Sequence, residues 1–259
     1  MRKILLLIAA AMAFVPLFFA PSAGAAELKL FGGGHFQASG QALVEAFTKK
    51  TGIAASYTPG NTGAGGMAKI LAAGEVIDVV VLNSDDMKMQ AEAGLIKRDS
   101  VVMFARNRLG LAVRKGAPKP DISTAEKVRA ALLAATTVGM QAPDPERPNR
   151  GINVVEVLTK LGILNEIKSK AFTINDPSTA LVGRKADISF WAYPELLERK
   201  DVDVLGPVPL ELGGLEEQSV GILARNQNDA DAKAFIRFLT SRDGEAVWTK
   251  TGLDPMAKR

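Results

Sequence analysis

Two loops of small residues are the segments whose residue types are best suited to hold a ligand. They are residues 32–39 (GGGHFQAS) and 60–66 (GNTGAGG), and each follows a strand-like segment and precedes a helix-like one. Backbone N–H groups and the positive end of a helix dipole meet at such a loop, where they attract a negatively charged group. The two loops therefore predict binding of a small anion.

Four larger side chains stand where a ligand would meet them. His35 is the only histidine and lies in the first loop, and a hydrogen bond to the ligand is one interpretation of it. Arg150 precedes Gly151 at the start of a helical stripe, where its guanidinium could hold a carboxylate or another oxyanion through two parallel hydrogen bonds. Trp191 and Tyr193 follow a strand and would wall a pocket. For all four, an ordinary loop or packing role stays open.

Other kinds of chemistry fit the sequence poorly. One histidine and no cysteine argue against a transition-metal centre, so we expect no metal and no cofactor. Residues 63–68 (GAGGMA) match a relaxed dinucleotide fingerprint, but the match follows the second strand instead of the first. No run of five basic residues exists, and the net charge is only +4, so no nucleic-acid partner is expected.

The first 25 residues have the pattern of a secretory leader. Arg2 and Lys3 precede an apolar stretch, and Ala23-Gly24-Ala25 forms a cleavage site. An uncleaved anchor is the alternative, although the apolar stretch is short for a span and contains Pro16. Removal of the leader leaves about 234 residues, with 30 basic against 28 acidic ones. We expect a protein released into an oxidising compartment such as the periplasm.

Strand-like and helix-like segments alternate along the chain, which predicts an α/β fold. Strands are expected at residues 28–31, 53–57, 76–82, 101–105, 109–114, 137–140, 172–174, 188–191 and 220–224. Ser39 and the Ser123/Glu126 pair are expected to cap helices, and Asp176-Pro177 is a strong helix start. Further helices are expected at 229–239 and 243–249. Two lobes follow, with crossings near residues 107–110 and 205–213.

Ligands of open α/β sheets bind beyond the carboxyl ends of the strands. Five loops meet that condition, at residues 32–39, 60–66, 141–150, 176–180 and 191–193. If the lobes face each other, these loops line one cleft. Hydroxyl groups of Ser39, Thr62 and Ser178 are expected to add hydrogen bonds there.

Four segments at these loops resemble the periplasmic molybdate-binding proteins and their wider relatives among type II solute-binding proteins. They are FGGGHFQASGQALVEAFTKKTG, GNTGAGGMAKILAAGEVIDVVVLNSDDMKMQAEAGLI, FARNRLGLAVRKGAP and PDPERPNRGINVVEVLTKLGIL. The resemblance runs from about residue 28 to 253. It implies a two-lobed type II fold with a mixed sheet and flanking helices in each lobe, lobe I from residues 26–107 and 208–259, and lobe II from residues 108–207.

The resemblance also implies a function. The family captures a small anion by hinge closure, as the substrate-binding component of an ABC importer whose permease and ATPase are the partners. We expect a monomer that performs no catalysis. A secreted hydrolase that uses His35, and a receptor that feeds a membrane sensor in place of a transporter, are the alternatives.

The family's ligand positions fall on residues that differ from its usual ones. Its first-loop serine falls on His35 beside Gly34, and its second-loop serine near Thr62 or Gly63. Amide positions of lobe II fall on Arg150 and near Thr179 or Ala180, and the closing tyrosine falls around Trp191 to Tyr193. Histidine and arginine in place of neutral groups suit a larger or carboxylate-bearing anion, so an organic carboxylate or a molybdate-like oxyanion is expected.

Overall fold

The computed structural model describes residues 27–60, 64–141 and 151–256. The expected leader and three expected ligand residues, Thr62, Gly63 and Arg150, lie outside these ranges. In the described ranges, none of the helices combines the length and the apolar composition that a membrane span requires.

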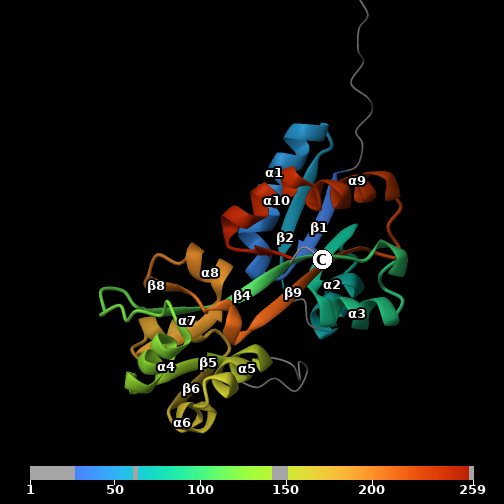
Figure 1. Cartoon of the computed structure of the whole chain (residues 1–259). Coiled ribbons are helices and arrows are strands. Elements are labelled where there is room, and N and C mark those ends of the chain that lie inside the picture. Colours follow the sequence, from blue (N-terminus) through green and yellow to red (C-terminus); the bar gives the residue numbers. More distant parts are fainter. Residues whose placement is uncertain (1–26, 61–63, 142–150, 257–259) are drawn as a thin grey trace, which may run out of the picture.

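Two sheets, joined through one strand, organise the molecule (Figure 1). The first has the order β2-β1-β3-β9-β4, with β1–β3 parallel and β9 antiparallel to both of its neighbours. The second has the order β4-β7-β5-β6, and β8 and β10 also pair with β4. The strands are β1 (Leu28–Gly32), β2 (Ala55–Pro59), β3 (Val79–Asn83), β4 (Val102–Arg114), β5 (Val138–Gln141), β6 (Ala171–Ile174), β7 (Ile188–Ala192), β8 (Val202–Pro207), β9 (Leu215–Ile222) and β10 (Asp254–Pro255).

Helices cover both sheets. Those of the first sheet are η1 (Gly34–Phe36), α1 (Gln37–Thr51), α2 (Ala64–Ala72), α3 (Ser84–Glu92), η2 (Arg98–Ser100), α9 (Asp229–Leu239), α10 (Arg242–Trp248) and η4 (Thr249–Thr251). Those of the second are α4 (Ala125–Ala134), α5 (Ile152–Lys160), α6 (Leu164–Lys168), α7 (Pro177–Val182), α8 (Tyr193–Glu198) and η3 (Leu210–Leu212). We call the first sheet with its helices lobe I and the second lobe II.

Strand β4 belongs to both lobes. Its residues up to Arg108 pair with β9, and its residues from Leu109 pair with β7. The chain returns to lobe I through residues 208–214, where the amide of Val208 donates to the carbonyl of Leu109 and the amide of Leu109 donates to that of Gly214. The two connections between the lobes therefore lie side by side. The boundaries of the lobes along the chain stay a prediction.

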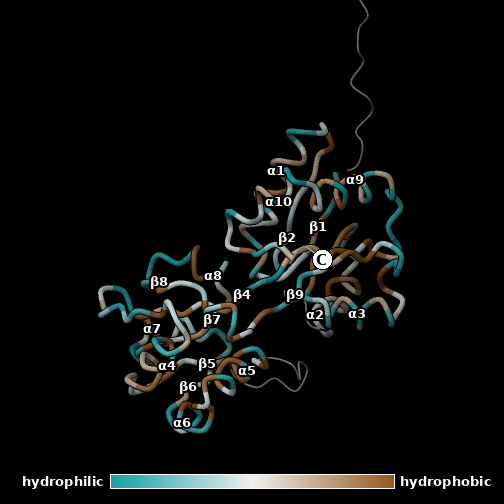
Figure 2. The backbone as a smooth tube through the Cα atoms, viewed as in Figure 1, coloured by the Kyte–Doolittle hydropathy of each residue, from teal (hydrophilic) through white to brown (hydrophobic). Residues whose placement is uncertain are grey.

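Each lobe has two clusters of buried hydrophobic residues. Figure 2 shows hydrophobic segments (brown) in both lobes. In β3, Val79 and Val81 pack with α1 and α9 residues, while Val80 and Leu82 pack on the opposite face near α2 and α3. Side chains of a strand alternate between faces, so a strand buried on both sides must be apolar throughout. The strand predicted at residues 76–82 is present, but it begins three residues later than expected, at Val79.

Several local predictions are confirmed and several are wrong. Asp176 caps α7 with proline at its first position, as expected, and Gly52 ends α1 in the left-handed conformation. Ser39 does not cap α1, because the helix begins two residues earlier; Thr124, not Ser123, caps α4. The two extended segments expected at 101–105 and 109–114 form the single strand β4. Strand β8 was not expected, and β9 begins five residues earlier than expected.

Candidate functional site

A cleft of about 880 Å³ lies between the lobes. Lobe I contributes the loop after β1, the start of α3 and the beginning of β9; lobe II contributes the start of α5 and the end of β7 with α8. The lining residues used below are Gly33, Gly34, His35, Asn107, Leu109, Ile152, Phe190, Trp191, Glu195 and Glu216. Such a volume lies within the range of pockets that bind small molecules.

The charged side chains of the described lining are mainly acidic. Carboxylates come from Asp85, Asp86, Glu92, Glu195, Glu216 and Glu217, and cations from Lys88 and Arg106. Among the described residues, no group of three or more histidine, aspartate and glutamate side chains is arranged to hold a metal ion. Carboxylates outnumber cations in the described part of the cleft lining. Recognition of an anion there therefore depends on single N–H and O–H donors and not on net positive charge.

The His35 side chain lies over Gly33. A Cβ atom at Gly33 would be 2.5 Å from His35 Cε1 and 2.7 Å from Nδ1, both far below van der Waals contact. Gly33 has φ −69° and ψ 161°, which any residue adopts, so the imidazole is what requires glycine here. A Cβ at Gly34 would meet nothing closer than Glu195 Oε1, at 3.6 Å.

This geometry gives a matched pair of variants. Gly33→Ala is expected to displace the His35 ring, whereas Gly34→Ala leaves it in place. The chain has one histidine, so the imidazole signals of a ¹⁵N-labelled sample report on His35 alone. Shifted signals in Gly33→Ala and wild-type signals in Gly34→Ala are expected. Equal spectra for wild type and Gly33→Ala would contradict the packing of the ring on Gly33.

The loop that carries His35 rests on four packed aromatic side chains, Tyr57, Phe36, Phe104 and Trp248, which we call the aromatic row. Phe36, fully buried, packs edge-on against Tyr57 and Phe104 at centroid distances of 5.8 and 5.9 Å, and Phe104 packs on Trp248 at 5.9 Å. The Tyr57 hydroxyl donates to the carbonyl of Gly33 at 2.9 Å. Burial raises the pKa of the Tyr57 phenol, so the hydroxyl keeps its proton. The loop that carries His35 is thus fixed on the core of lobe I.

Side chains from β9 and β4 hold the far end of the imidazole. His35 Nε2 lies 2.7 Å from Gln218 Oε1. The Gln218 amide nitrogen donates to Glu216 Oε2 at 3.3 Å, and Asn107 Nδ2 donates to the same oxygen at 3.4 Å. Gln218 is fully buried and Asn107 almost so. The histidine of the first loop is therefore hydrogen-bonded directly to β9, and it is linked to β4 only through Gln218 and Glu216.

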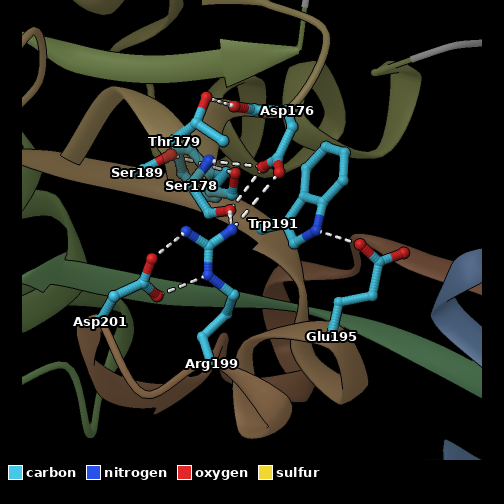
Figure 3. Close-up of polar contacts among 9 residues, drawn as sticks. Asp176, Ser178, Thr179, Ser189, Trp191, Glu195, Arg199 and Asp201 are labelled. Carbon is cyan, nitrogen blue, oxygen red and sulfur yellow. Dashed lines mark hydrogen bonds and ion pairs between the residues drawn. The ribbon is translucent and has the colours of Figure 1, made fainter. Parts of the chain in front are cut away.

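Glu195 lines the cleft from lobe II. Figure 3 shows its carboxylate beside the Trp191 indole. The indole N–H of Trp191 donates to its Oε2, and Oε1 lies over Gly34 of lobe I. Burial raises the pKa of Glu195, and the carboxylates of Asp176 and Glu198 act in the same direction, against the opposing effects of His35 and the Trp191 hydrogen bond. A second contact from α8 also crosses between the lobes, since the Ala38 amide donates to Glu198 Oε1 at 3.2 Å.

The raised pKa has a consequence for stability. The folded protein binds the Glu195 proton more tightly than the unfolded chain does, so the stabilisation is complete below the ordinary glutamate pKa and is lost as the pH rises through the folded value. Relative to wild type, the melting temperature of Glu195→Gln is therefore expected to rise progressively as the pH increases from the ordinary glutamate pKa through the raised pKa of the folded protein. Exposed Glu211→Gln is the control, and a difference that stays constant with pH for Glu195→Gln would refute the assignment.

Arg199 fixes α7 and the end of α8 behind the cleft wall (Figure 3). Its guanidinium donates through Nε and Nη2 to both oxygens of Asp201, at 2.6 and 2.7 Å. Nη1 donates to Ser178 Oγ at 2.7 Å and pairs with Asp176 at 3.4 Å. A planar guanidinium forms such a fork with fixed geometry. The wall that carries Trp191 and Glu195 is held by this cluster.

The structure brings only part of the expected ligand set together. Gly34, His35 and Trp191 line the cleft. Ala180 is buried in the core of lobe II, and exposed Thr179 donates its hydroxyl to the Asp176 carbonyl; neither lines the cleft. The Tyr193 ring packs beside Gly110 and Gly252, near the point where β4 passes from lobe I to lobe II.

The hydroxyls expected from Ser39 and Ser178 are engaged elsewhere. Ser39 is buried and bonds Thr251, and Ser178 is bonded to Asp176 and Arg199. The expectation that these two hydroxyls face a ligand is therefore wrong for this structure. Sequence reasoning missed Glu195, Glu216 and Gln218. Glu195 had a weak signal, as an acid in the first turn of a helix that follows Trp191, while the two strand residues had none.

Known proteins resemble this chain over almost its whole length. An aconitate isomerase of Pseudomonas sp. is 27% identical over 221 residues, which cover 83% of this chain and 82% of that protein. The substrate-binding domain of a putative molybdenum ABC transporter from Clostridium difficile superposes with a TM-score of 0.70 at 17% identity, over 89% of this chain and 99% of that one. The periplasmic molybdate-binding protein of Azotobacter vinelandii gives 0.69 at 19% identity, over 90% and 100%.

The fold is that of the two-lobed type II periplasmic binding proteins, as the sequence predicts. The model of the bacterial extracellular solute-binding proteins matches residues 28–254. The chain belongs to that family, and its role is to bind a substrate.

Proposed function

We propose that this protein binds a small organic carboxylate between its lobes, as the periplasmic substrate-binding component of an ABC importer. The observation that carries the proposal is the composition of the cleft. Apolar Leu109, Ile152 and Phe190 line the same cleft as polar His35 and Glu195. A carbon skeleton uses both kinds of surface, whereas a bare tetrahedral oxyanion uses only donors.

The family and the named relatives support the rest of the proposal. Two structural relatives bear names that point to molybdenum or molybdate uptake, and the aconitate isomerase bears the name of a tricarboxylate substrate. We propose a monomer that follows a cleaved leader into the periplasm and docks on a permease with its ATPase. A membrane sensor as the receiving partner is the alternative, and neighbouring genes for a permease and an ATPase would favour the importer.

The proposed mechanism is a hinge at the paired connections, β4 near Leu109 and the returning segment 208–214. Contacts from both lobes exist together only when the cleft is closed, so the ligand shifts the population toward the closed form. We propose Gly34, His35 and Trp191 as contacts, and Arg150, Thr62 and Gly63 on the sequence argument alone. Glu195 joins this set because its carboxyl lies in the cleft beside Trp191.

Thermal unfolding with a panel of anions tests the proposal. The panel contains molybdate, tungstate, sulfate, malate, citrate, tricarballylate and both aconitates. A ligand present at about 100 times its Kd stabilises the folded state by about 2.7 kcal/mol. One or more carboxylates are expected to raise the melting temperature by several degrees. A melting-temperature response to molybdate and tungstate alone would refute the proposal that the ligand is an organic carboxylate. No response to any anion at millimolar concentration would refute the proposal that the protein is an anion receptor.

A second candidate function is an isomerase that moves a proton within an unsaturated carboxylate. The aconitate isomerase relative favours it, together with two groups in the cleft that can exchange protons, His35 from lobe I and Glu195 from lobe II. One group removes a proton from the carbon next to the double bond, and the other delivers a proton at the far end, so the double bond moves without any oxidant.

Incubation with trans-aconitate in D₂O separates the two functions. The isomerase predicts cis-aconitate and deuterium at carbon in the ¹H spectrum, both lost in His35→Ala and Glu195→Gln. The receptor predicts an unchanged substrate. The hydrolase alternative predicts cleavage of an ester or amide that depends on His35, which the same variant tests.

A further inference from the structure

The orientation of the buried Gln218 amide is fixed by groups that can only accept. Its Nε2 faces Glu216 Oε2 at 3.3 Å and the Glu216 carbonyl at 3.5 Å. A carboxylate and a carbonyl both need a donor, so the NH₂ group must lie on that side and Oε1 must face His35. Asn107 donates to the same carboxylate oxygen from β4 and completes its surroundings.

The amide oxygen in turn decides the state of the imidazole. Oε1 lies 2.7 Å from His35 Nε2 and can only accept, so Nε2 carries a hydrogen. In a neutral imidazole with hydrogen on Nε2, Nδ1 holds a lone pair. Nδ1 lies on the edge of the ring next to Gly33 and has no hydrogen-bond partner among the described residues, and both His35 and Gly33 line the cleft. A neutral His35 therefore presents a lone pair, not a donor, to a bound anion.

We propose that Glu216 and Gln218 are positioning residues that make anion binding at His35 proton-coupled. An anion in contact with Nδ1 needs a hydrogen there, and with Nε2 already protonated this hydrogen must be a second proton from solvent. Each anion captured at this position then brings one proton onto His35, and its release returns that proton. The inference rests on the proposed function, because it specifies how the same cleft recognises its anion.

Other titratable groups surround His35. Glu195 and Glu198 approach from α8, Tyr57 from β2 through the Gly33 carbonyl, and Glu216 from β9 through Gln218. Glu198 accepts from the start of α1, and Tyr57 keeps its proton. Glu195 is the other group in the cleft that could exchange a proton on ligand binding, so the test must separate it from His35.

The first part of the test needs no ligand. In ¹⁵N-labelled protein at about pH 9, where imidazoles are neutral, the two ring nitrogens of the only histidine have distinct signals. Wild type is expected to show hydrogen on Nε2 alone. Glu216→Gln gives Gln218 a neighbour that can also donate, so its amide can turn and a mixture of tautomers is expected. Exposed Glu211→Gln is the matched control. A wild-type tautomer with hydrogen on Nδ1, or no change in Glu216→Gln, overturns the inference.

The second part uses citrate as the probe in calorimetric titrations at about pH 6 and pH 8.5. Wild-type affinity is expected to fall at least tenfold at the higher pH, because the uptake of one coupled proton by a neutral imidazole changes affinity tenfold per pH unit. His35→Gln and Glu216→Gln are expected to lose most of this dependence, and Glu195→Gln to keep it. If the pH dependence of citrate affinity is lost in Glu195→Gln and kept in the other two variants, the inference is overturned. No citrate binding at either pH argues against the proposed function, while the tautomer decides the inference separately.

Discussion

Replacing Phe36 by alanine is expected to lower the free energy of unfolding by about 3–5 kcal/mol and to release His35 from Gln218. Phe36 is fully buried and stands in the aromatic row between Tyr57 and Phe104, directly after the histidine that the cleft uses. The substitution leaves a cavity under the loop, and the loop can then relax into it. Denaturant unfolding measures the first effect, and the imidazole signals measure the second.

Phe235 provides the matched control. It is also fully buried, belongs to the same core and packs edge-on against Phe47 at 5.3 Å, but it lies on α9. Phe235→Ala is expected to lose a similar free energy and to keep the wild-type imidazole signals. Phe36→Leu, a smaller change, covers the case in which the alanine variant fails to fold. Identical histidine spectra for the variants at both positions would show that the aromatic row does not hold the loop.

Gly214→Ala is expected to destabilise the protein by about 2–4 kcal/mol. Gly214 has φ +70°, and a Cβ there would lie 2.7 Å from Val157 Cγ2 and 3.1 Å from Leu109 Cδ1. The residue lies in the segment that returns the chain to lobe I, where its carbonyl accepts from Leu109 and its amide donates to Glu156. Strain at Gly214 therefore acts on both connections between the lobes, which are β4 near Leu109 and the returning segment 208–214.

The control for this variant is Gly162→Ala. Gly162 has φ +66°, but nothing lies within 4 Å of a Cβ at that position. Gly162→Ala is expected to lower the free energy of unfolding only through the strain of a left-handed backbone with a side chain, about 1–2 kcal/mol. Urea unfolding of both variants isolates the contact with Val157 and Leu109, and the double variant Val157→Ala/Gly214→Ala should show a favourable coupling energy. Equal losses for the two glycine variants would show that the crossing tolerates a side chain.

The features that sequence predicts here are those determined by neighbours in the chain. The β-branched apolar run that ends at Leu82 predicts a buried strand, and Asp176-Pro177 predicts a helix start. Strand β4 was divided in the prediction because its pattern changes at Arg108 and Leu109, where the strand passes from one sheet to the other. The residue pattern shows a change at Arg108 and Leu109, but it does not show that one strand passes between two sheets there.

The site was predictable only in part, because its contacts join distant segments. His35 was found by its residue type and its loop, yet its partner Gln218 lies 183 residues away in a strand with no distinguishing pattern. Tyr193 was expected in the cleft, and the structure places its ring at the lobe crossing beside Gly110 and Gly252. Which side of a short helix faces the cleft depends on tertiary packing that no local spacing encodes.

The position of β9 also determines when the molecule can finish folding. This strand, residues 215–222, lies between β3 and β4 in the sheet of lobe I, and both pair with it instead of with each other. A ribosome must therefore synthesise more than four-fifths of the chain before the first lobe can close its sheet, although that lobe begins at the N-terminus. Domains otherwise tend to fold from the N-terminus during synthesis. For a chain that we propose crosses a membrane before it folds, this delay keeps the nascent protein in a form that can be exported.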